Sequence, residues 1–261
     1  MTITSPQNPK IKALLALQQK SSERRKQGLF VVEGLRELQH CIQAGLEVTT
    51  LFHQPDLLPA LPLNKVPTTY EVTQSVYEKI AYRGSTEGII AIVRAKPTKL
   101  SDLRLKAHPL IIVLESVEKP GNLGAILRSA DAAGVDAVIV CDPLTDLYNP
   151  NLIRSSIGAI FTVPCVACSS EECISFLNGH GIQILTAQLQ DSLPYYDTDM
   201  TQGTAIVMGT ESTGLTTQWR TAANAHIRIP MLGQLDSLNV SVSAAILMFE
   251  AVRQREGRKK V

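Results

Sequence analysis

The feature of this sequence that most constrains its fold is a regular alternation of apolar strands and helices after residue 109. The expected strands are short, continuous apolar runs such as Leu110 to Leu114 and Ala137 to Cys141. Runs of this kind, separated by helices, are typical of a parallel sheet that helices cover on both faces. We expect strands at 110–114, 137–141, 162–166, 182–187, 204–208 and 226–229, and helices ending at 133 and spanning 152–159, 170–178 and 239–255.

The first third of the chain predicts a second, smaller α/β domain. Its expected strands are 29–33, 48–52 and 88–94, and its expected helices are 8–19, 34–44 and 74–80. A polar, proline-containing stretch begins at Lys96 and is typical of a linker between domains. The chain has 261 residues, more than the roughly 150 of a typical single domain. We therefore predict a domain over 1–97, a linker over 98–107 and a second domain over 108–261.

Charge is distributed unevenly along the chain. The formal net charge is only +1, but residues 1–30 carry six basic side chains against one acidic one. Residues 253–261 carry five basic side chains against one acidic one. Basic ends beside a mildly acidic body suit an anionic partner such as RNA. The alternative is that the two ends are simply charged and solvated.

Two sequence signals bear on location and on metal binding. We find no secretory signal and no apolar run near the roughly 18 residues of a membrane-spanning helix, and we expect a cytoplasmic protein with reduced cysteines and no membrane partner. Cys165-Val-Ala-Cys168, with Cys173 and His180 downstream, invites a zinc interpretation. A single C-x-x-C without a second pair is a weak metal motif. We therefore predict no metal site and interpret the cysteines as core or surface residues.

The first of three unusual loops follows the strand at 110–114. Ligands of parallel sheets bind beyond the carboxyl ends of strands, so these loops are the candidate sites. Gly121-Asn-Leu-Gly124 does not spell the G-x-G-x-x-G of dinucleotide-binding proteins. Asn122 is suited to cap the following helix, and Arg128 falls nearly opposite the helix's apolar stripe, one turn beyond Gly124. The alternative is a capped amphipathic helix with a solvated arginine.

The second and third loops leave the strands at 204–208 and 226–229. Two glycines in Met208-Gly-Thr-Glu-Ser-Thr-Gly-Leu215 would let a ligand touch the backbone, and Glu211 either caps neighbouring amides or accepts from a ligand. The third loop ends where Ser237 or Asn239 can cap a long helix. That helix is apolar on almost every side, and burial against a second copy of the chain would explain this pattern.

In this order, the three loops resemble the motifs of the SpoU (TrmH-type) RNA ribose methyltransferases. N-x-G-x-x-x-R spans Asn122 to Arg128, G-x-E-x-x-G-L spans Gly209 to Leu215, and I-P-M with S-L-N-V-S-V spans Ile229 to Val242. The front third is similar to the family's RNA-binding domain, with F-V-V-E-G-L-R at Phe30 to Arg36. The resemblance implies a C-terminal parallel sheet with a deep trefoil knot, S-adenosylmethionine as cofactor and a homodimer through the C-terminal helix.

The resemblance also implies roles for individual residues. It places cofactor contacts at Gly209, Ile229, Ser237 and Leu238, and polar active-site groups at Asn122, Arg128, Glu211 and Asn239, with Ser237 matching a polar position as well. A guanidinium is effectively always protonated, so we interpret Arg128 as a cationic clamp on a phosphate or a developing alkoxide rather than as a base.

The expected function is methylation of a ribose 2′-hydroxyl in structured RNA, with S-adenosylmethionine as methyl donor. Ribosomal RNA is preferred because the front domain resembles that of the ribosomal branch, and transfer RNA is the alternative substrate. A non-catalytic RNA-binding protein on the same fold is a second possibility, which the intact Asn122, Arg128 and Asn239 set disfavours. A nucleotide-dependent oxidoreductase is a third, which the failed glycine fingerprint disfavours.

Overall fold

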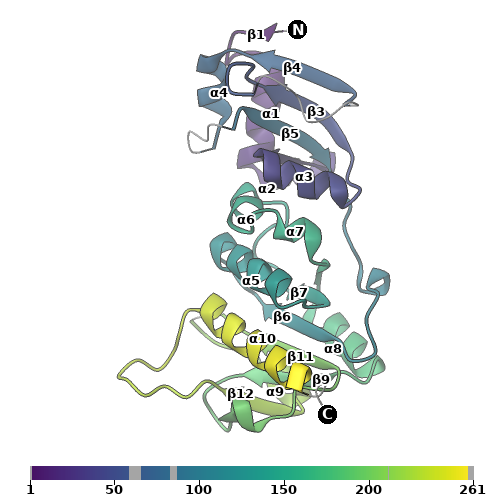
Figure 1. Cartoon of the computed structure of the whole chain (residues 1–261), viewed down its shortest axis with the longest axis vertical. Helices are drawn as coiled ribbons and strands as arrows, with labels where there is room; N and C mark the ends of the chain where they lie inside the picture. Colours follow the sequence, from purple (N-terminus) through teal and green to yellow (C-terminus); the bar gives the residue numbers. More distant parts are fainter. Residues whose placement is uncertain (1, 59–65, 83–86, 211, 258–261) are drawn as a thin grey trace. The chain divides into compact units, whose positions relative to one another are not determined.

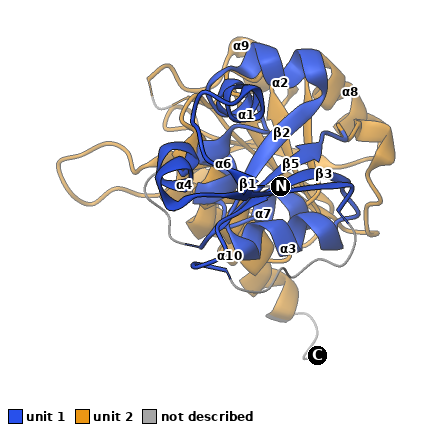
Figure 2. Cartoon of the chain, turned by 90° about the horizontal axis from the view of Figure 1, so that it is seen from above, with its two compact units in different colours: residues 1–96, 146–162 blue, residues 97–145, 163–261 orange. Residues whose placement is uncertain are grey.

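The computed structural model describes residues 2–58, 66–82, 87–210 and 212–257. The chain divides into two compact units (Figure 2). Unit 1 comprises residues 1–96 and 146–162, and unit 2 comprises residues 97–145 and 163–261. The boundary between the two units at residue 97 adjoins the predicted linker. Residues 146–162, which the prediction assigned to the second domain, instead pack within unit 1.

The described strands of unit 1 form a five-stranded mixed sheet in the order β1-β4-β3-β5-β2. Strands β1 (Thr2–Ile3), β4 (Thr68–Val72) and β3 (Val48–His53) run parallel. Strand β5 (Ile89–Arg94) runs antiparallel to both β3 and β2 (Leu29–Glu33). The three predicted strands are present. Strands β1 and β4 were not predicted, because their sequences are polar or very short.

Helices cover both faces of this sheet. The cluster on one face combines residues of α1 (Pro9–Gln19) and α4 (Gln74–Ile80) with alternate residues of the strands. Helix α2 (Ser21–Gln27) follows α1 directly. Helices α3 (Leu35–Gln43) and α6 (Pro150–Ser155) contact β2, and α7 (Ala159–Thr162) contacts α3. The segment 146–162 therefore completes the core of unit 1.

The stretch Phe30 to Arg36 has a structural explanation within unit 1. Phe30 is buried and stacks on Tyr148 with ring centroids 4.4 Å apart, and on Phe161 at 5.9 Å. Gly34 has a φ of 104°, and a Cβ there would lie 3.0 Å from a carboxylate oxygen of Glu87. Only glycine adopts this conformation at low cost, so the stretch is constrained by the fold itself.

Arg24, one of the basic side chains of the N-terminal segment, is buried within unit 1. Its side chain is only 4% exposed and its Nε lies 2.5 Å from Asp146 Oδ2. Its Nη1 donates to the carbonyl oxygens of Leu17 at 2.6 Å and Gln18 at 3.1 Å. One of the basic side chains counted toward an anionic partner therefore stabilises unit 1 instead.

The described strands of unit 2 form a seven-stranded sheet in the order β10-β12-β9-β11-β6-β7-β8, with parallel pairing throughout. Strands β6 (Leu110–Glu115) and β11 (Thr204–Met208) lie side by side at its centre. On one side follow β7 (Ala137–Cys141) and β8 (Cys165–Cys168). On the other side follow three strands: β9 (Gln183–Ala187), β12 (Ala225–Arg228) and β10 (Leu193–Pro194). The predicted parallel α/β fold is confirmed.

Two pairs of helices pack in unit 2 around this sheet. Helices α8 (Ser170–Gly179) and α9 (Thr217–Ala222) share one apolar cluster with alternate residues of the central strands. Helix α10 (Val240–Gly257) packs on α5 (Pro120–Ala132) and contacts β11, as Figure 1 shows for the yellow helix beside the teal one. The threading of this unit as a trefoil knot stays a prediction.

Several predicted boundaries need correction. The expected helix over 152–159 is two short helices, α6 and α7, and the expected strand at 162–166 begins only at Cys165. The apolar residues 159–161 therefore belong to a helix, because a short apolar run fits either structure. Asn122 does not cap α5: Lys119 holds the cap position, and Asn122 lies in the first turn. Helix α9 was not predicted.

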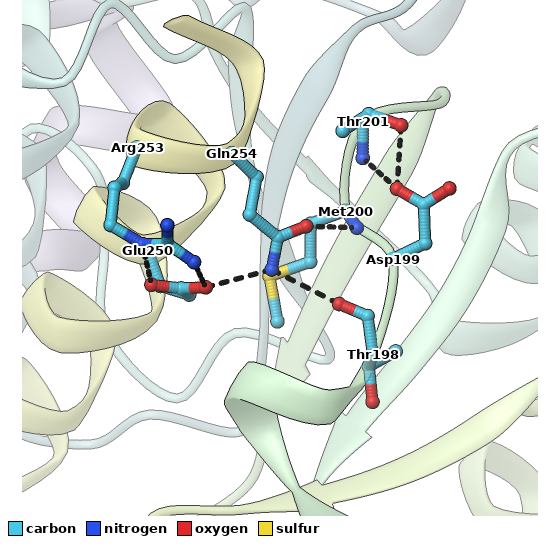
Figure 3. A network of polar contacts seen from close by, with 7 residues as sticks. All are labelled: Thr198, Asp199, Met200, Thr201, Glu250, Arg253 and Gln254. Carbon is cyan, nitrogen blue, oxygen red and sulfur yellow. Dashed lines mark hydrogen bonds and ion pairs between the residues drawn. The ribbon is translucent and has the colours of Figure 1, made fainter. Parts of the chain in front are cut away.

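Polar side chains anchor the end of α10 to the segment Thr198 to Thr201 (Figure 3). Gln254 donates to the Thr198 carbonyl at 3.1 Å and accepts from the Met200 amide at 2.8 Å. Glu250 accepts from Arg253 at 2.7 and 2.8 Å, and from Gln254 at 2.8 Å. Arg255 donates to four backbone carbonyls, those of His108, Pro109, Met200 and Gln202. Two of the basic side chains near the C-terminus are thus engaged within unit 2.

Candidate active site

The candidate site lies at the carboxyl edge of the seven-stranded sheet. Leu114 of β6 and Met208 of β11 are directly paired, so the chain leaves both strands at the same level. Strand β9 lies beside β11, and β12 lies beside β9. Adjacent parallel strands bring the loops that follow them together, which is where ligands of such sheets bind.

A cavity of about 610 Å³ opens among these loops. Its volume falls within the roughly 300–1,000 Å³ of small-molecule sites. All four residues predicted to contact the cofactor line it, namely Gly209, Ile229, Ser237 and Leu238. Asn239, a predicted active-site residue, lines it as well. The structure therefore brings the predicted cofactor contacts from two distant loops into one cavity.

Gly209 lies against the backbone of Gly214 and Leu215, at the other end of the same loop. A Cβ at Gly209 would lie 2.6 Å from Leu215 N, and closer still to the carbonyl carbon and oxygen of Gly214. Thr210 holds the turn, because its hydroxyl accepts from Thr213 N at 3.0 Å and its carbonyl accepts from Gly214 N at 3.1 Å. Backbone groups, with no side chain in front of them, thus form this part of the wall.

Glu115, at the end of β6, fixes the far end of the same loop. It is 3% exposed, and its carboxylate accepts from Thr216 N at 2.9 Å and from Thr216 Oγ1 at 2.7 Å. The carboxylate thereby ties β6 to the residue before α9. This contact was not predicted from the sequence. The one sign of it there is an acidic residue at the end of an otherwise apolar strand.

Two asparagines join the first and third predicted loops. Asn239 Nδ2 donates to Asn122 Oδ1 at 3.2 Å. Asn239 Oδ1 accepts from Ser241 N at 3.0 Å and from Ser241 Oγ at 2.6 Å, so Asn239 also caps α10. Of the two predicted caps, Asn239 is the one that is used. The pairing of Asn122 with Asn239 links α5 to α10 at the carboxyl edge.

A second cavity of about 120 Å³ borders the first. Asn122 and Lys119 line it, together with Gly209, Thr210 and Val240, and the last three also line the large cavity. Lys119 was not singled out by the sequence analysis, since a lysine before a helix carries no signal of its own. The two cavities share a wall, so a ligand in the large one lies next to Asn122.

Of the predicted active-site residues that the structure describes, Arg128 is the one that it does not bring into this group. Arg128 is exposed on α5, has no hydrogen-bond or ion-pair partner within the described part of the chain, and is not among the residues that line either cavity. Glu211 lies outside the described residues. Arg128 is six residues beyond Asn122, about 9 Å along the helix axis.

The lining of the large cavity fits S-adenosylmethionine. Apolar side chains of Met208, Ile229 and Leu238 offer contacts for an adenine ring, and Gly209 and Gly214 line the cavity with backbone that carries no side chain. Arg220 and Asp236 add charged groups of both signs, as a zwitterionic amino acid requires. Residues 188–190, which follow β9, also line the cavity, and they were not predicted because they contain no glycine or motif.

Comparisons with known proteins show which family the chain belongs to. Residues 109–249 match the SpoU rRNA Methylase family, and residues 8–91 match the MRM3-like substrate binding domain. The chain is 28% identical over 248 residues to the Bacillus subtilis 23S rRNA (guanosine(2553)-2'-O)-methyltransferase RlmP, covering 95% of this chain and 97% of the relative. It is 38% identical over 193 residues to the Vibrio vulnificus 23S rRNA (guanosine-2'-O-)-methyltransferase RlmB, covering 71% of this chain and 77% of the relative.

A solved structure is similar over nearly the whole chain. It is the AdoMet-bound rRNA methyltransferase from Sinorhizobium meliloti, with a TM-score of 0.89, 29% identity and 97% coverage of both chains. An α/β protein with a ligand cavity at the carboxyl edge of a parallel sheet is one broad class. Within that class, this chain belongs to the SpoU rRNA methylase family.

Family membership confirms the main functional predictions. The chain is an enzyme, an RNA methyltransferase, and its cofactor is S-adenosylmethionine. The N-terminal similarity to an RNA-binding domain is confirmed by the match to a substrate-binding domain. No helix in the described ranges is both long and apolar enough to cross a lipid bilayer.

Proposed function

We propose that this chain methylates a ribose 2′-hydroxyl of ribosomal RNA, and that the two cavities at the carboxyl edge of unit 2 form its active site. The observation that carries the proposal is the single cavity that gathers Gly209, Ile229, Ser237 and Leu238 beside the Asn122–Asn239 pair. Relatives over most of the chain are named 23S rRNA 2′-O-methyltransferases, which favours ribosomal over transfer RNA. A cytoplasmic location remains a prediction.

The loops of the large cavity hold the cofactor by shape and by backbone contacts. Bound S-adenosylmethionine supplies a methyl group on a positively charged sulfur. Gly209 lets the backbone approach the cofactor directly, and the turn held by Thr210 keeps that wall rigid. Ile229 and Leu238 close the cavity from the third loop. Rigid placement matters because methyl transfer needs the reacting atoms in line.

The small cavity receives the ribose. Asn122 and Lys119 line it on the side of α5, and the amide of Asn239 holds Asn122 in place. A pair of bonded amides has few alternative orientations, so Asn122 presents a fixed donor and acceptor to a sugar hydroxyl. Asn122 therefore orients the ribose, and Lys119 places a positive charge near an RNA phosphate or a developing alkoxide.

Arg128 acts as the cationic clamp on the RNA. A guanidinium remains protonated and binds phosphate through two parallel hydrogen bonds. Its side chain is exposed, and no internal contact within the described residues holds it back from RNA. Because Arg128 is not among the residues that line the cavities of its own chain, we assign it to an RNA phosphate beside the target nucleotide, reached from either copy of a dimer.

Unit 1 binds the RNA outside the active site. Exposed basic side chains lie along α1 and α2, namely Lys10, Lys12, Lys20, Arg25 and Lys26. Phosphate contacts of this kind supply affinity without sequence information. Arg24 is excluded from this role, since its guanidinium is buried against Asp146.

Two copies of the chain assemble through α10. One side of this helix is buried through Ala244, Leu247 and Met248. On another side Val242 and Phe249 are 47% and 48% exposed, and they lie seven residues apart on one helical face. An apolar stripe of this kind on a soluble surface marks an interface, and a self-complementary helix face gives a two-fold dimer. A Phe249→Glu variant that stays dimeric in sedimentation would contradict this assignment.

The role of Arg128 is tested by Arg128→Ala. Methyl transfer to ribosomal RNA lacking the modification should fall roughly 100-fold, because without the phosphate clamp the target ribose is no longer held in line with the methyl group. Affinity for S-adenosylmethionine should stay within about twofold, because Arg128 is not among the cavity-lining residues. The matched control is Arg25→Ala, which should weaken RNA binding only modestly. Full activity of Arg128→Ala would reject the clamp.

A further inference from the structure

Three cysteines outside the active site converge at the opposite half of the sheet. The sulfur atoms of Cys141, Cys168 and Cys173 all lie within 4.8 Å of one another. Cys141 ends β7, Cys168 ends β8, and the two are directly paired across the strands. Cys173 comes from the first turn of α8. Cys165, which the sequence pattern joined to Cys168, is not part of this group.

The three thiols differ in their surroundings. Cys141 and Cys173 are fully buried in the apolar cluster beneath α8 and α9. Cys168 is half-buried and lies at the edge of the same cluster. A buried thiol alone behaves as a small apolar side chain. Here, however, the sulfur atoms of the two buried thiols lie within 4.8 Å of that of Cys168, the one of the three that solvent reaches.

The surroundings of Cys168 favour its ionised form. Hydrogen bonds donated by Cys141 and Cys173 hold the pKa of Cys168 below its ordinary value, while burial and the charges of Glu172 and Asp142 oppose this shift. Cys168 also lies just before the N-terminus of α8, where the helix dipole stabilises negative charge. Burial instead raises the pKa of Cys41 and of Cys165 to about 12. Among the cysteines, Cys168 is therefore the one whose thiolate is accessible at neutral pH.

We propose that Cys168 is an oxidation site for hydroperoxides and that Cys141 resolves the oxidised form as a disulfide. A low-pKa, accessible cysteine beside a second cysteine is the arrangement of redox-sensitive thiols. Directly paired residues of neighbouring strands have Cα atoms roughly 4.8 Å apart. That separation lies within the roughly 4.4–6.8 Å of protein disulfides, so the bond forms without a backbone rearrangement.

The chemistry balances with hydrogen peroxide as the oxidant. The Cys168 thiolate attacks one peroxide oxygen, the O–O bond breaks, and hydroxide leaves while Cys168 becomes a sulfenic acid. The Cys141 sulfur then attacks the Cys168 sulfur, and the S–O bond breaks as the S–S bond forms. The departing oxygen takes the Cys141 proton and leaves as water. The hydroxide of the first step takes up the proton that the Cys168 thiol released on ionising, so two thiols lose two electrons in total and the peroxide is reduced to two waters.

The test treats the full-length reduced protein with hydrogen peroxide and counts its thiols. The chain has five free cysteines, so a single disulfide should lower the count to three while the denatured, unreduced protein keeps the mass of one chain. Peptide mapping should join Cys141 to Cys168. Cys165→Ser is the matched control on the same strand, and it should form the same disulfide. Cys168→Ser should form none.

Two further measurements guard against misfolded variants and wrong partners. In Cys141→Ala, a cyclic diketone that traps sulfenic acids should label Cys168, and Cys173→Ala should still form the Cys141–Cys168 bond. Mapping on the unaltered chain needs no variant. A thiol count that stays at five would overturn the proposal, as would oxidation that begins at Cys165 or Cys41. A Cys168–Cys173 disulfide would refute Cys141 as the resolving residue.

Discussion

Replacing Gly209 with alanine perturbs the cofactor wall by a single methyl group. The new Cβ would lie 2.6 Å from Leu215 N, and closer to the Gly214 carbonyl. Ordinary van der Waals contact begins at 3.4 Å. The segment Gly214 to Leu215 must therefore move by about 0.8 Å or more, because backbone atoms cannot rotate away as a flexible side chain can. The glycine-lined wall of the cavity is displaced by that amount.

This displacement sets the size of the expected effect. A misplacement of about 1 Å costs roughly 100-fold in reaction rate, and we expect a loss of the same size in cofactor affinity, which corresponds to about 2.7 kcal/mol. We expect the Kd for S-adenosylmethionine, measured by titration calorimetry, to rise by that factor. Overpacking should lower the free energy of unfolding by about 1–3 kcal/mol, so the titration is run where both proteins are folded.

Gly233→Ala is the matched control. Gly233 is exposed in the loop before α10, and a Cβ there would meet no atom within 4 Å. Its affinity for the cofactor should therefore equal that of the unaltered chain. If Gly209→Ala binds S-adenosylmethionine as tightly as Gly233→Ala, the backbone at Gly209 is not the cofactor wall and the reasoning fails.

Three other predictions concern stability and the active-site amides. Arg24→Ala should lower the free energy of unfolding in urea by about 3–5 kcal/mol, because Asp146 keeps a largely buried charge, whereas Arg25→Ala should change it by less than about 0.5 kcal/mol. Asn239→Ala removes a helix cap, so the free energy of unfolding should fall by about 1 kcal/mol. The same change removes the amide that donates to Asn122, so methyl transfer should slow in a methyl-incorporation assay. Hydrogen bonds from Arg253 lower the pKa of Glu250, so its stabilisation is present above the unfolded value and lost as pH falls through the folded one. Glu250→Gln should flatten that part of the acid-unfolding curve.

The sequence predicts the C-terminal half of the fold well, because buried parallel strands leave continuous apolar runs. The strands at 137–141 and 204–208 match the structure at both ends. Prediction fails where an apolar run is too short to choose between a helix and a strand, as at Thr162, which was predicted to begin a strand and instead ends α7. It also fails for β4, whose Thr and Tyr residues do not form an apolar run.

Motifs predict the cofactor cavity better than they predict the polar contacts around it. Glycines and capping residues mark the loops, so Gly209 and Asn239 could be found from the sequence. The contact of Glu115 with Thr216 joins residues about one hundred positions apart, and no local pattern encodes it. The convergence of Cys141, Cys168 and Cys173 depends on the strand order of the sheet for the same reason.

The proposed active site is the cavity that Gly209 lines, where a methyl group is transferred to a ribose oxygen. The most direct measurement supplies isotopically labelled S-adenosylmethionine and unmodified ribosomal RNA, and then hydrolyses the product in alkali. Methylation of a 2′-hydroxyl blocks cleavage of the neighbouring phosphodiester, so the label should remain in alkali-resistant dinucleotides and should disappear with Gly209→Ala. Label recovered in single nucleotides with a methylated base, or no label in RNA at all, would contradict the account.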